Sequence, residues 1–219
     1  ALTTAQVIAL TTDQVSGLSS AQTALLETAD IAVLTTAQVA NLGNSAVAAM
    51  TTLQIAALTT AQVAALTSDQ LNGLGSSAIA ALGTHQVRAL TSDQLSNLAT
   101  VQIARLDTAD VAALSTTQIG DLSTDFVVAL TTAQVANMQT AQIAALTTGH
   151  INAMASAALQ ALTTAQVRAF TADQLGNLSA DQLALMSPLG VGALSSSQIS
   201  NLSTDAVAAL TTAQAAALS

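Results

Sequence analysis

The sequence predicts an all-α solenoid of very short, capped helices, with one helix in each eight-residue repeat. Leucine recurs every eight residues from Leu2 to Leu218 without an insertion. Its replacements are all large and apolar: Met50, Met138, Met154, Phe170 and Met186. Counted from its leucine, each octad has Thr or Ser at positions 2 and 3, Ala or Asp at 4, Gln at 5, Val, Ile or Leu at 6, and small residues at 7 and 8. A fixed short period of this kind indicates a repeat architecture.

The first half of the octad has the pattern of a helix N-terminus. Thr59 stands three residues before Gln62, which is the spacing of a capping box, with the threonine as N-cap. Leu58 and Val63 then occupy the two places of a hydrophobic staple. The only proline, Pro188, falls at position 3, the first helical residue, where a missing N–H costs nothing.

The second half of the octad carries signals for a helix end. Residues that tolerate positive φ, typical just after a helix, stand at position 8: Gly17, Asn41, Gly73, Asn97, Asn137, Asn177 and Asn201. All acidic residues except Asp121 occupy positions 2 to 5, and the three arginines, Arg88, Arg105 and Arg168, occupy positions 7 and 8. The helix dipole favours anions in the first turn and cations in the last, so each octad contains one helix.

Two other folds are less compatible with the period. In one continuous helix, eight residues at 100° each would rotate the leucine stripe by about 80° per octad. A β-solenoid is the alternative fold, but the apolar positions 1 and 6 are an odd number of residues apart and would point to opposite faces of a strand. Ala, Gln and Leu also favour helix over strand.

Longer periods describe how the octads are arranged. Odd-numbered octads carry Gln at position 5 except at His150, whereas other residues often replace it in even-numbered octads: Asp30, Ala46, Ala78, Asp110, Phe126, Ala158, Gly190 and Ala206. This alternation predicts about two repeats, or 16 residues, per turn.

An 80-residue superperiod relates Glu27–Ile31 to Asp107–Val111. We therefore expect residues 1–219 to form a single continuous solenoid of about 27 repeats, cut as a window from a longer array because it starts and stops within an octad.

The composition restricts the possible partners. The net charge is −9 and lysine is absent, which opposes binding to nucleic acid because phosphate must be neutralised by Lys or Arg. No run approaches 18 apolar residues, so no membrane-spanning segment is expected. Cysteine is absent, which excludes disulfides and thiolate sites. Leu66, Leu90, Val63 and Ile103 should lie in a thin buried seam, since positions 1 and 6 are the regular large apolar places.

We find no pattern for catalysis, a cofactor or a metal, and predict that the chain is not an enzyme. His85 and His150 occupy different octad positions without a partner carboxylate at a fixed spacing, so each is interpreted as a surface or capping residue. The Asp residues at position 4 are too irregular for a calcium repeat. Phe126, where a glutamine is usual, and the arginines Arg88 and Arg168, 80 residues apart, are the candidates for self-association contacts.

Leu58-Thr-Thr-Ala-Gln-Val-Ala-Ala-Leu66 resembles the short Thr/Ala/Gln-rich tandem octapeptide repeats of large secreted or surface-anchored bacterial proteins, including adhesin-like ones. The resemblance implies an extracellular or cell-surface location. We expect a structural protein, a rod-like repeat that forms a filament, stalk or spacer by self-association, because its low charge offers little repulsion between copies. The alternatives are the repeat region of an adhesin, and a binding module presenting regular threonine rows to a repetitive ligand such as ice.

Overall fold

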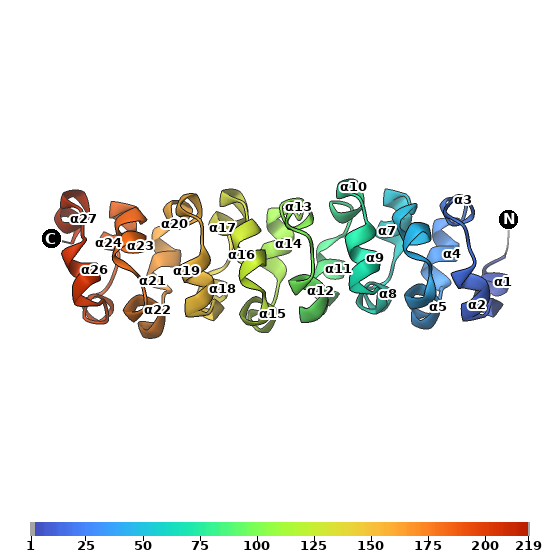
Figure 1. Cartoon of the computed structure of the whole chain (residues 1–219), viewed down its shortest axis with the longest axis horizontal. Coiled ribbons are helices and arrows are strands. Elements are labelled where there is room, and N and C mark those ends of the chain that lie inside the picture. Colours follow the sequence, from blue (N-terminus) through green and yellow to red (C-terminus); the bar gives the residue numbers. More distant parts are fainter. Residues whose placement is uncertain (1–2, 219) are drawn as a thin grey trace. The chain divides into compact units, whose positions relative to one another are not determined.

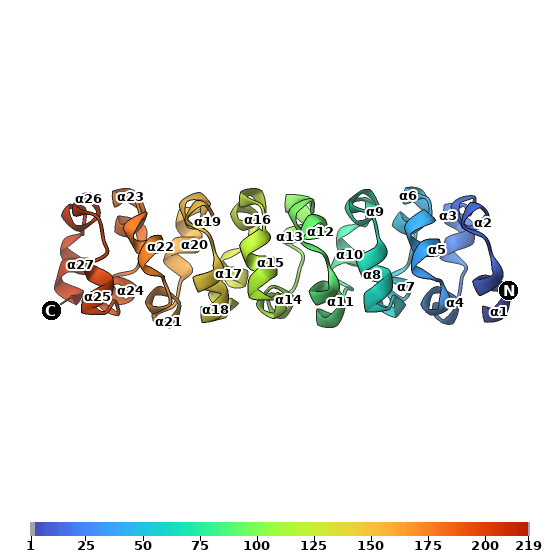
Figure 2. The same ribbon diagram turned by 90° about the horizontal axis from the view of Figure 1, so that it is seen from below.

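The computed structural model describes residues 3–218, and within this range it contains helices and no strand. Each octad forms one helix of four to six residues. The all-α repeat solenoid expected from the octad is thus confirmed. The chain divides into two compact units, Ala1–Ala113 and Leu114–Ser219. Figures 1 and 2 show the helices of each unit stacked in rows.

Unit 1 contains the first fourteen helices: α1 (Thr4–Ala9), α2 (Thr12–Ser16), α3 (Ser20–Ala24), α4 (Thr28–Val33), α5 (Thr36–Asn41), α6 (Asn44–Ala48), α7 (Thr52–Ala57), α8 (Thr60–Ala65), α9 (Ser68–Gly73), α10 (Ser76–Ile79), α11 (Thr84–Ala89), α12 (Ser92–Ser96), α13 (Thr100–Ile103) and α14 (Thr108–Ala113).

Unit 2 contains the remaining helices: α15 (Thr116–Asp121), α16 (Thr124–Ala129), α17 (Thr132–Asn137), α18 (Thr140–Ala145), α19 (Thr148–Ala153), α20 (Ser156–Ala161), α21 (Thr164–Arg168), α22 (Ala172–Gly176), α23 (Ala180–Leu185), α24 (Pro188–Gly192), α25 (Ser196–Ile199), α26 (Thr204–Ala208) and α27 (Thr212–Ala217).

One turn of the solenoid contains three octads, or 24 residues, and the prediction of two octads per turn is wrong. Helices pack against the helices three places before and after them, as in α2–α5–α8–α11 of unit 1 and α17–α20–α23 of unit 2. Each unit therefore has three rows of helices. The alternation of odd and even octads is no guide to the number of rows, because stacking in steps of three places odd and even octads alternately along every row.

The backbone between successive helices explains the three-sided turn. Leu66 follows α8 as its C-cap with φ −60° and ψ 140°, and Thr67 precedes α9 as its N-cap with φ −74° and ψ 158°. Within residues 3–218 no residue has a positive φ, so the expectation of left-handed residues at position 8 is wrong. Two extended residues make an open corner rather than a reversal of the chain. Asn41 at position 8 instead donates from Nδ2 to the Ala37 carbonyl at 2.8 Å.

The helix N-termini and the seam follow the sequence predictions. Thr59 Oγ1 accepts the Gln62 N–H at 3.2 Å, while Gln62 Oε1 accepts the Thr59 N–H at 2.7 Å, which completes the capping box. Pro188 is the first residue of α24. Leu66, Leu90, Val63 and Ile103 are all buried. Since isolated helices of this length are unstable in water, this buried seam must supply most of their stability.

Candidate functional site

The glutamine at position 5 is the side chain that joins one turn of the solenoid to the next. Gln62 is buried. Its Oε1 caps its own helix at Thr59, and its Nε2 donates to the carbonyls of Ile31 at 2.8 Å and Leu34 at 2.7 Å. Those carbonyls lie at the end of α4, where the last carbonyl groups of a helix lack the regular intrahelical N–H donors. One amide therefore satisfies a helix start in one turn and a helix end in the turn before it.

This arrangement, here called the glutamine bridge, recurs with the same offsets of 31 and 28 residues. It is formed by Gln38, Gln54, Gln70, Gln86, Gln94 and Gln102 in unit 1, and by Gln166, Gln174 and Gln214 in unit 2. The sequence held a signal for it: a capping box accepts Glu or Gln, yet glutamate never stands at position 5. A second contact that needs a donor explains this preference, since a glutamate would face two carbonyl oxygens.

His150 takes the place of a bridging glutamine in α19. The ring is buried, with Nδ1 3.2 Å from the Thr147 nitrogen and Nε2 2.8 Å from the Leu122 carbonyl oxygen. Because Nδ1 must accept the Thr147 N–H, the proton of the neutral ring is assigned to Nε2, which donates to Leu122. The interpretation of His150 as a capping residue agrees with this geometry. In the described part of the chain, no three His, Cys or acidic residues gather as a metal site.

Asp110, at position 5 of α14, is a buried carboxyl group. Burial raises its pKa above the usual value, opposed by hydrogen bonds from the Thr84 hydroxyl and the Asp107 backbone N–H; the nearby Asp107 charge raises it further. Its carboxylate accepts from the Asp107 nitrogen at 3.3 Å, so it caps the helix as glutamine does. A carboxylate has no donor for the second half of a glutamine bridge.

The predicted self-association residues have different environments. Phe126 is fully buried in unit 2, so its proposed role as a contact between copies is wrong. The error came from treating position 5 as a surface place, whereas most glutamines and their replacements there are buried against the preceding turn. Arg88 of unit 1 and Arg168 of unit 2 are exposed, and their role in self-association stays a prediction.

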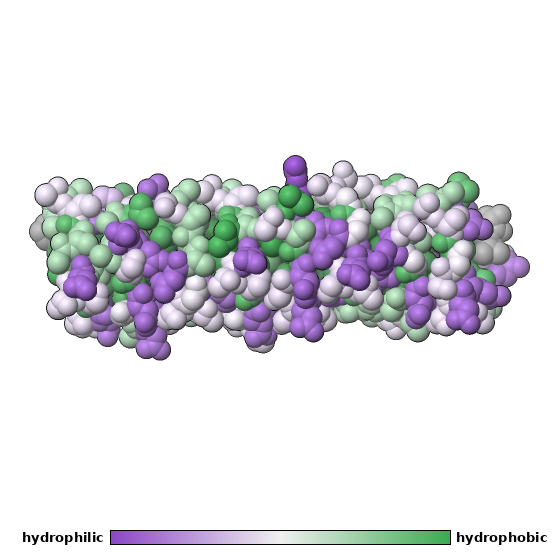
Figure 3. Space-filling view, viewed as in Figure 1, coloured by the Kyte–Doolittle hydropathy of each residue, from purple (hydrophilic) through white to green (hydrophobic). Residues whose placement is uncertain are grey.

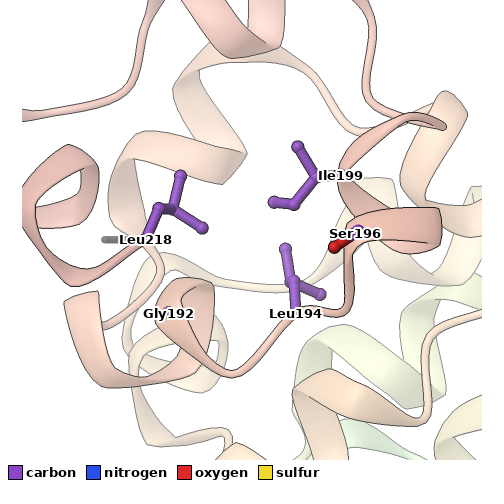
Figure 4. A pocket seen from close by; sticks show the side chains of 5 residues that line it. All are labelled: Gly192, Leu194, Ser196, Ile199 and Leu218. Carbon is purple, nitrogen blue, oxygen red and sulfur yellow. The ribbon is translucent and has the colours of Figure 1, made fainter.

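A small cavity of about 280 Å³ lies in the last turns of unit 2 (Figure 4). Its walls come from Gly192, Leu194, Ser196, Ile199 and Leu218. Apart from the Ser196 hydroxyl these walls offer only backbone polar atoms, and none of the five side chains titrates as an acid or base in the physiological range. The cavity thus lacks the paired titratable groups with which acid–base chemistry is performed.

Short capped helices, three to a turn and joined by buried amides, define a helical tandem-repeat protein. A model of the ALTTAQ repeat matches residues 24–60, 47–76, 63–100, 103–140, 127–156, 151–188 and 191–219. The chain belongs to the ALTTAQ repeat family, whose six-letter pattern is written out at Ala57–Gln62. No curated protein matches the chain. Among the described residues, no helix is long and apolar enough to cross a membrane.

Proposed function

We propose that this chain is a structural protein, whose repeat forms an extracellular filament, stalk or spacer by self-association. The observation that carries the proposal is the glutamine bridge, because wherever it occurs it joins a turn to the preceding one by the same groups at the same offsets. Repeat proteins gain stability mainly from contacts between neighbouring repeats. A repeat joined in this way can be extended in length without a new kind of contact, which suits a spacer.

The surface composition supports association between copies. Charged residues make up 7% of the chain, and the outward positions of the helices carry mostly Ala, Thr and Ser. On the faces visible in Figure 3, weakly polar and apolar residues separate the hydrophilic ones. Little charge means little repulsion when such faces approach one another. The bacterial cell-surface location and the adhesin-like role belong to the proposal and rest on the resemblance of Leu58–Leu66 to secreted repeats.

Sedimentation velocity of the purified chain over a wide concentration range, with negative-stain microscopy of the same samples, tests the proposal. We expect species larger than the monomer to grow with concentration, and elongated or laterally paired particles in the images. A chain that stays monomeric at the highest concentration, as dispersed compact particles, contradicts self-association.

A binding module is the second candidate, and one observation favours it. The first residue of most helices is an exposed threonine or serine, and Thr4, Thr28 and Thr52 occupy this place at intervals of one turn along the row α1–α4–α7. Regularly spaced hydroxyl groups could match a repetitive ligand such as ice. An ice-shaping and thermal-hysteresis assay tests this function, and normal ice growth at high protein concentration removes it.

A further inference from the structure

One of the three rows of helices in unit 1 carries no charged residue at octad positions 4 and 7, where its residues are apolar except for one serine. The row consists of α1, α4, α7, α10 and α13, each packed against the next. Octad positions 4 and 7 are three residues apart and share the outward side of each helix. We define the apolar face by the residues at these positions, all exposed: Ala5, Ile8, Ala29, Ala32, Leu53, Ala56, Ser77, Ala80, Val101 and Ala104.

The large side chains of this face lie in solvent to an unusual degree. Ile8 is 50% exposed, Leu53 72% and Val101 66%. Among the described residues of unit 1, Leu25 is the only other exposed large hydrophobic residue. Single exposed apolar residues are ordinary, whereas exposed apolar side chains that share one face are typical of interaction sites. Their gathering on one row therefore needs an explanation.

The other two rows of unit 1 differ at the same octad positions. Position 4 is Asp13 in α2 and His85 in α11, and position 7 of α11 is Arg88. In the third row, the neighbouring helices α9 and α12 carry Asp69 and Asp93. The nearest exposed charges of the apolar row lie outside positions 4 and 7, at Glu27 and Arg105.

We propose that the apolar face is the surface through which two copies of this chain associate, each using the same face. The proposal rests on the function proposed above and names the surface that performs it. The chain carries a net charge of −9, so two copies repel one another wherever their acidic rows meet. Contact through the apolar face avoids that repulsion and removes Ile8, Leu53 and Val101 from water. A self-complementary pairing follows, because an apolar surface matches a second copy of itself.

The size of the face sets the strength of the contact. The helices of this row have four to six residues and are therefore about 6–9 Å long. They stack about 8–10 Å apart, so the row covers roughly 350 Å². Stable interfaces bury roughly 800 Å² on each partner. Pairing through this face is therefore weak and reversible, and it strengthens when several faces act together.

A pair of double variants with equal charge tests the proposal in the whole chain. Leu53→Asp with Val101→Asp places two acidic residues on the apolar face, at position 4. Ala37→Asp with Ala61→Asp places two at the same octad position in α5 and α8, on another row. Both pairs should fold, because Asp69 and Asp93 already occupy this position, and circular dichroism checks this. Sedimentation equilibrium then measures the association constant.

We expect the face variant to lower the association constant by at least about a hundredfold, since like charges would meet across the interface. The control should change it by no more than about threefold, because its added charges stay in solvent. Equal association of the wild type and both variants overturns the apolar face and leaves the structural function standing. A wild type that never associates overturns the proposed function itself, and equal losses in both variants assign association to net charge rather than to this face.

Discussion

Helices α8 and α24 are joined to neighbouring turns by different means. In α8, Gln62 spans to the end of α4 through hydrogen bonds to Ile31 and Leu34. In α24, Gly190 stands at the glutamine position, and a Cβ there would come within 3.0 Å of Val167 Cγ2. Helix α24 also packs closely against α27. A Cβ added to Gly192, at the end of α24, would lie 2.5 Å from the carbonyl oxygen of Ala217 in α27. A polar bridge and close backbone packing are therefore two solutions to the same stacking problem.

The comparison shows what the octad requires at position 5. Where a preceding turn packs against it, the side chain must leave room for that turn, but it need not be polar: Ala46, Ala158 and Phe126 are all buried there. Where glutamine is present, its amide adds an N–H donor for carbonyls at a helix end, which lack the regular intrahelical donors. Each kind of junction therefore predicts a different response to mutation.

The largest effect is expected at the glutamine bridge. Gln62→Glu keeps an acceptor for the Thr59 N–H but directs a carboxylate at the carbonyls of Ile31 and Leu34. Because a buried polar group without a partner, and a charge still more, costs free energy, unit 1 should lose about 3 kcal/mol of unfolding free energy at neutral pH. Urea unfolding followed by circular dichroism measures this.

The control for the glutamine bridge is Gln6→Glu, since Gln6 is exposed and caps its own helix at Thr3. This change should alter stability by less than about 0.5 kcal/mol. Equal losses at residues 6 and 62 would mean that the bond to the preceding turn contributes nothing.

The close packing of α24 predicts the next effect. Gly192→Ala should destabilise unit 2 by about 1–3 kcal/mol, because the added methyl group meets backbone atoms of Ala217 that cannot rotate away. Gly73→Ala is the control, since the nearest atoms there lie 3.8 Å and 3.9 Å away, and it should be neutral or stabilising because alanine favours helix. Thermal unfolding of both variants decides between a tight junction and a loose one.

Asp110 tests a carboxylate at the same octad position. Its pKa is raised in the folded chain, chiefly by burial, so the ionised form is less favourable in the fold than in the unfolded chain. Below the pKa of aspartate in the unfolded chain, about 3.9, Asp110 is protonated in both states and its full contribution to the stability of the fold is present. That contribution is lost as the pH rises through the pKa of Asp110 in the folded chain.

Asp110→Asn should therefore unfold at a higher temperature than the wild type at pH 7, and this advantage should shrink as the pH falls towards 4. Calorimetric melting temperatures between pH 3 and 8 measure the trend. A variant that is less stable at pH 7 would show that the charged form is favoured by the fold.

The smallest effect concerns the other half of the capping box. Gly83 is the N-cap of α11 and lacks the side chain that would accept an N–H, although Gln86 already caps its backbone nitrogen at 2.8 Å. Gly83→Thr should stabilise unit 1 by a few tenths of a kcal/mol, about 0.3, since glycine is only slightly worse than threonine at this place. Guanidinium unfolding of paired samples can resolve the change. A loss of stability would indicate that a threonine side chain does not fit this corner.

The sequence determined the helix starts and the buried positions, which depend on neighbours within one octad, although it gave a wrong backbone conformation for position 8. Thr59 and Gln62 specify a capped helix start, Pro188 fits its first turn, and Leu66 and Val63 specify the buried side, because these interactions span only a few residues of chain. The tertiary structure alone decided the number of octads per turn, the second hydrogen bond of Gln62 and the burial of Phe126. These depend on the angle of the backbone between successive helices and on atoms 28 to 31 residues away in the sequence. An eight-residue period fits a solenoid with two octads per turn as well as one with three, so the sequence pattern could not distinguish them.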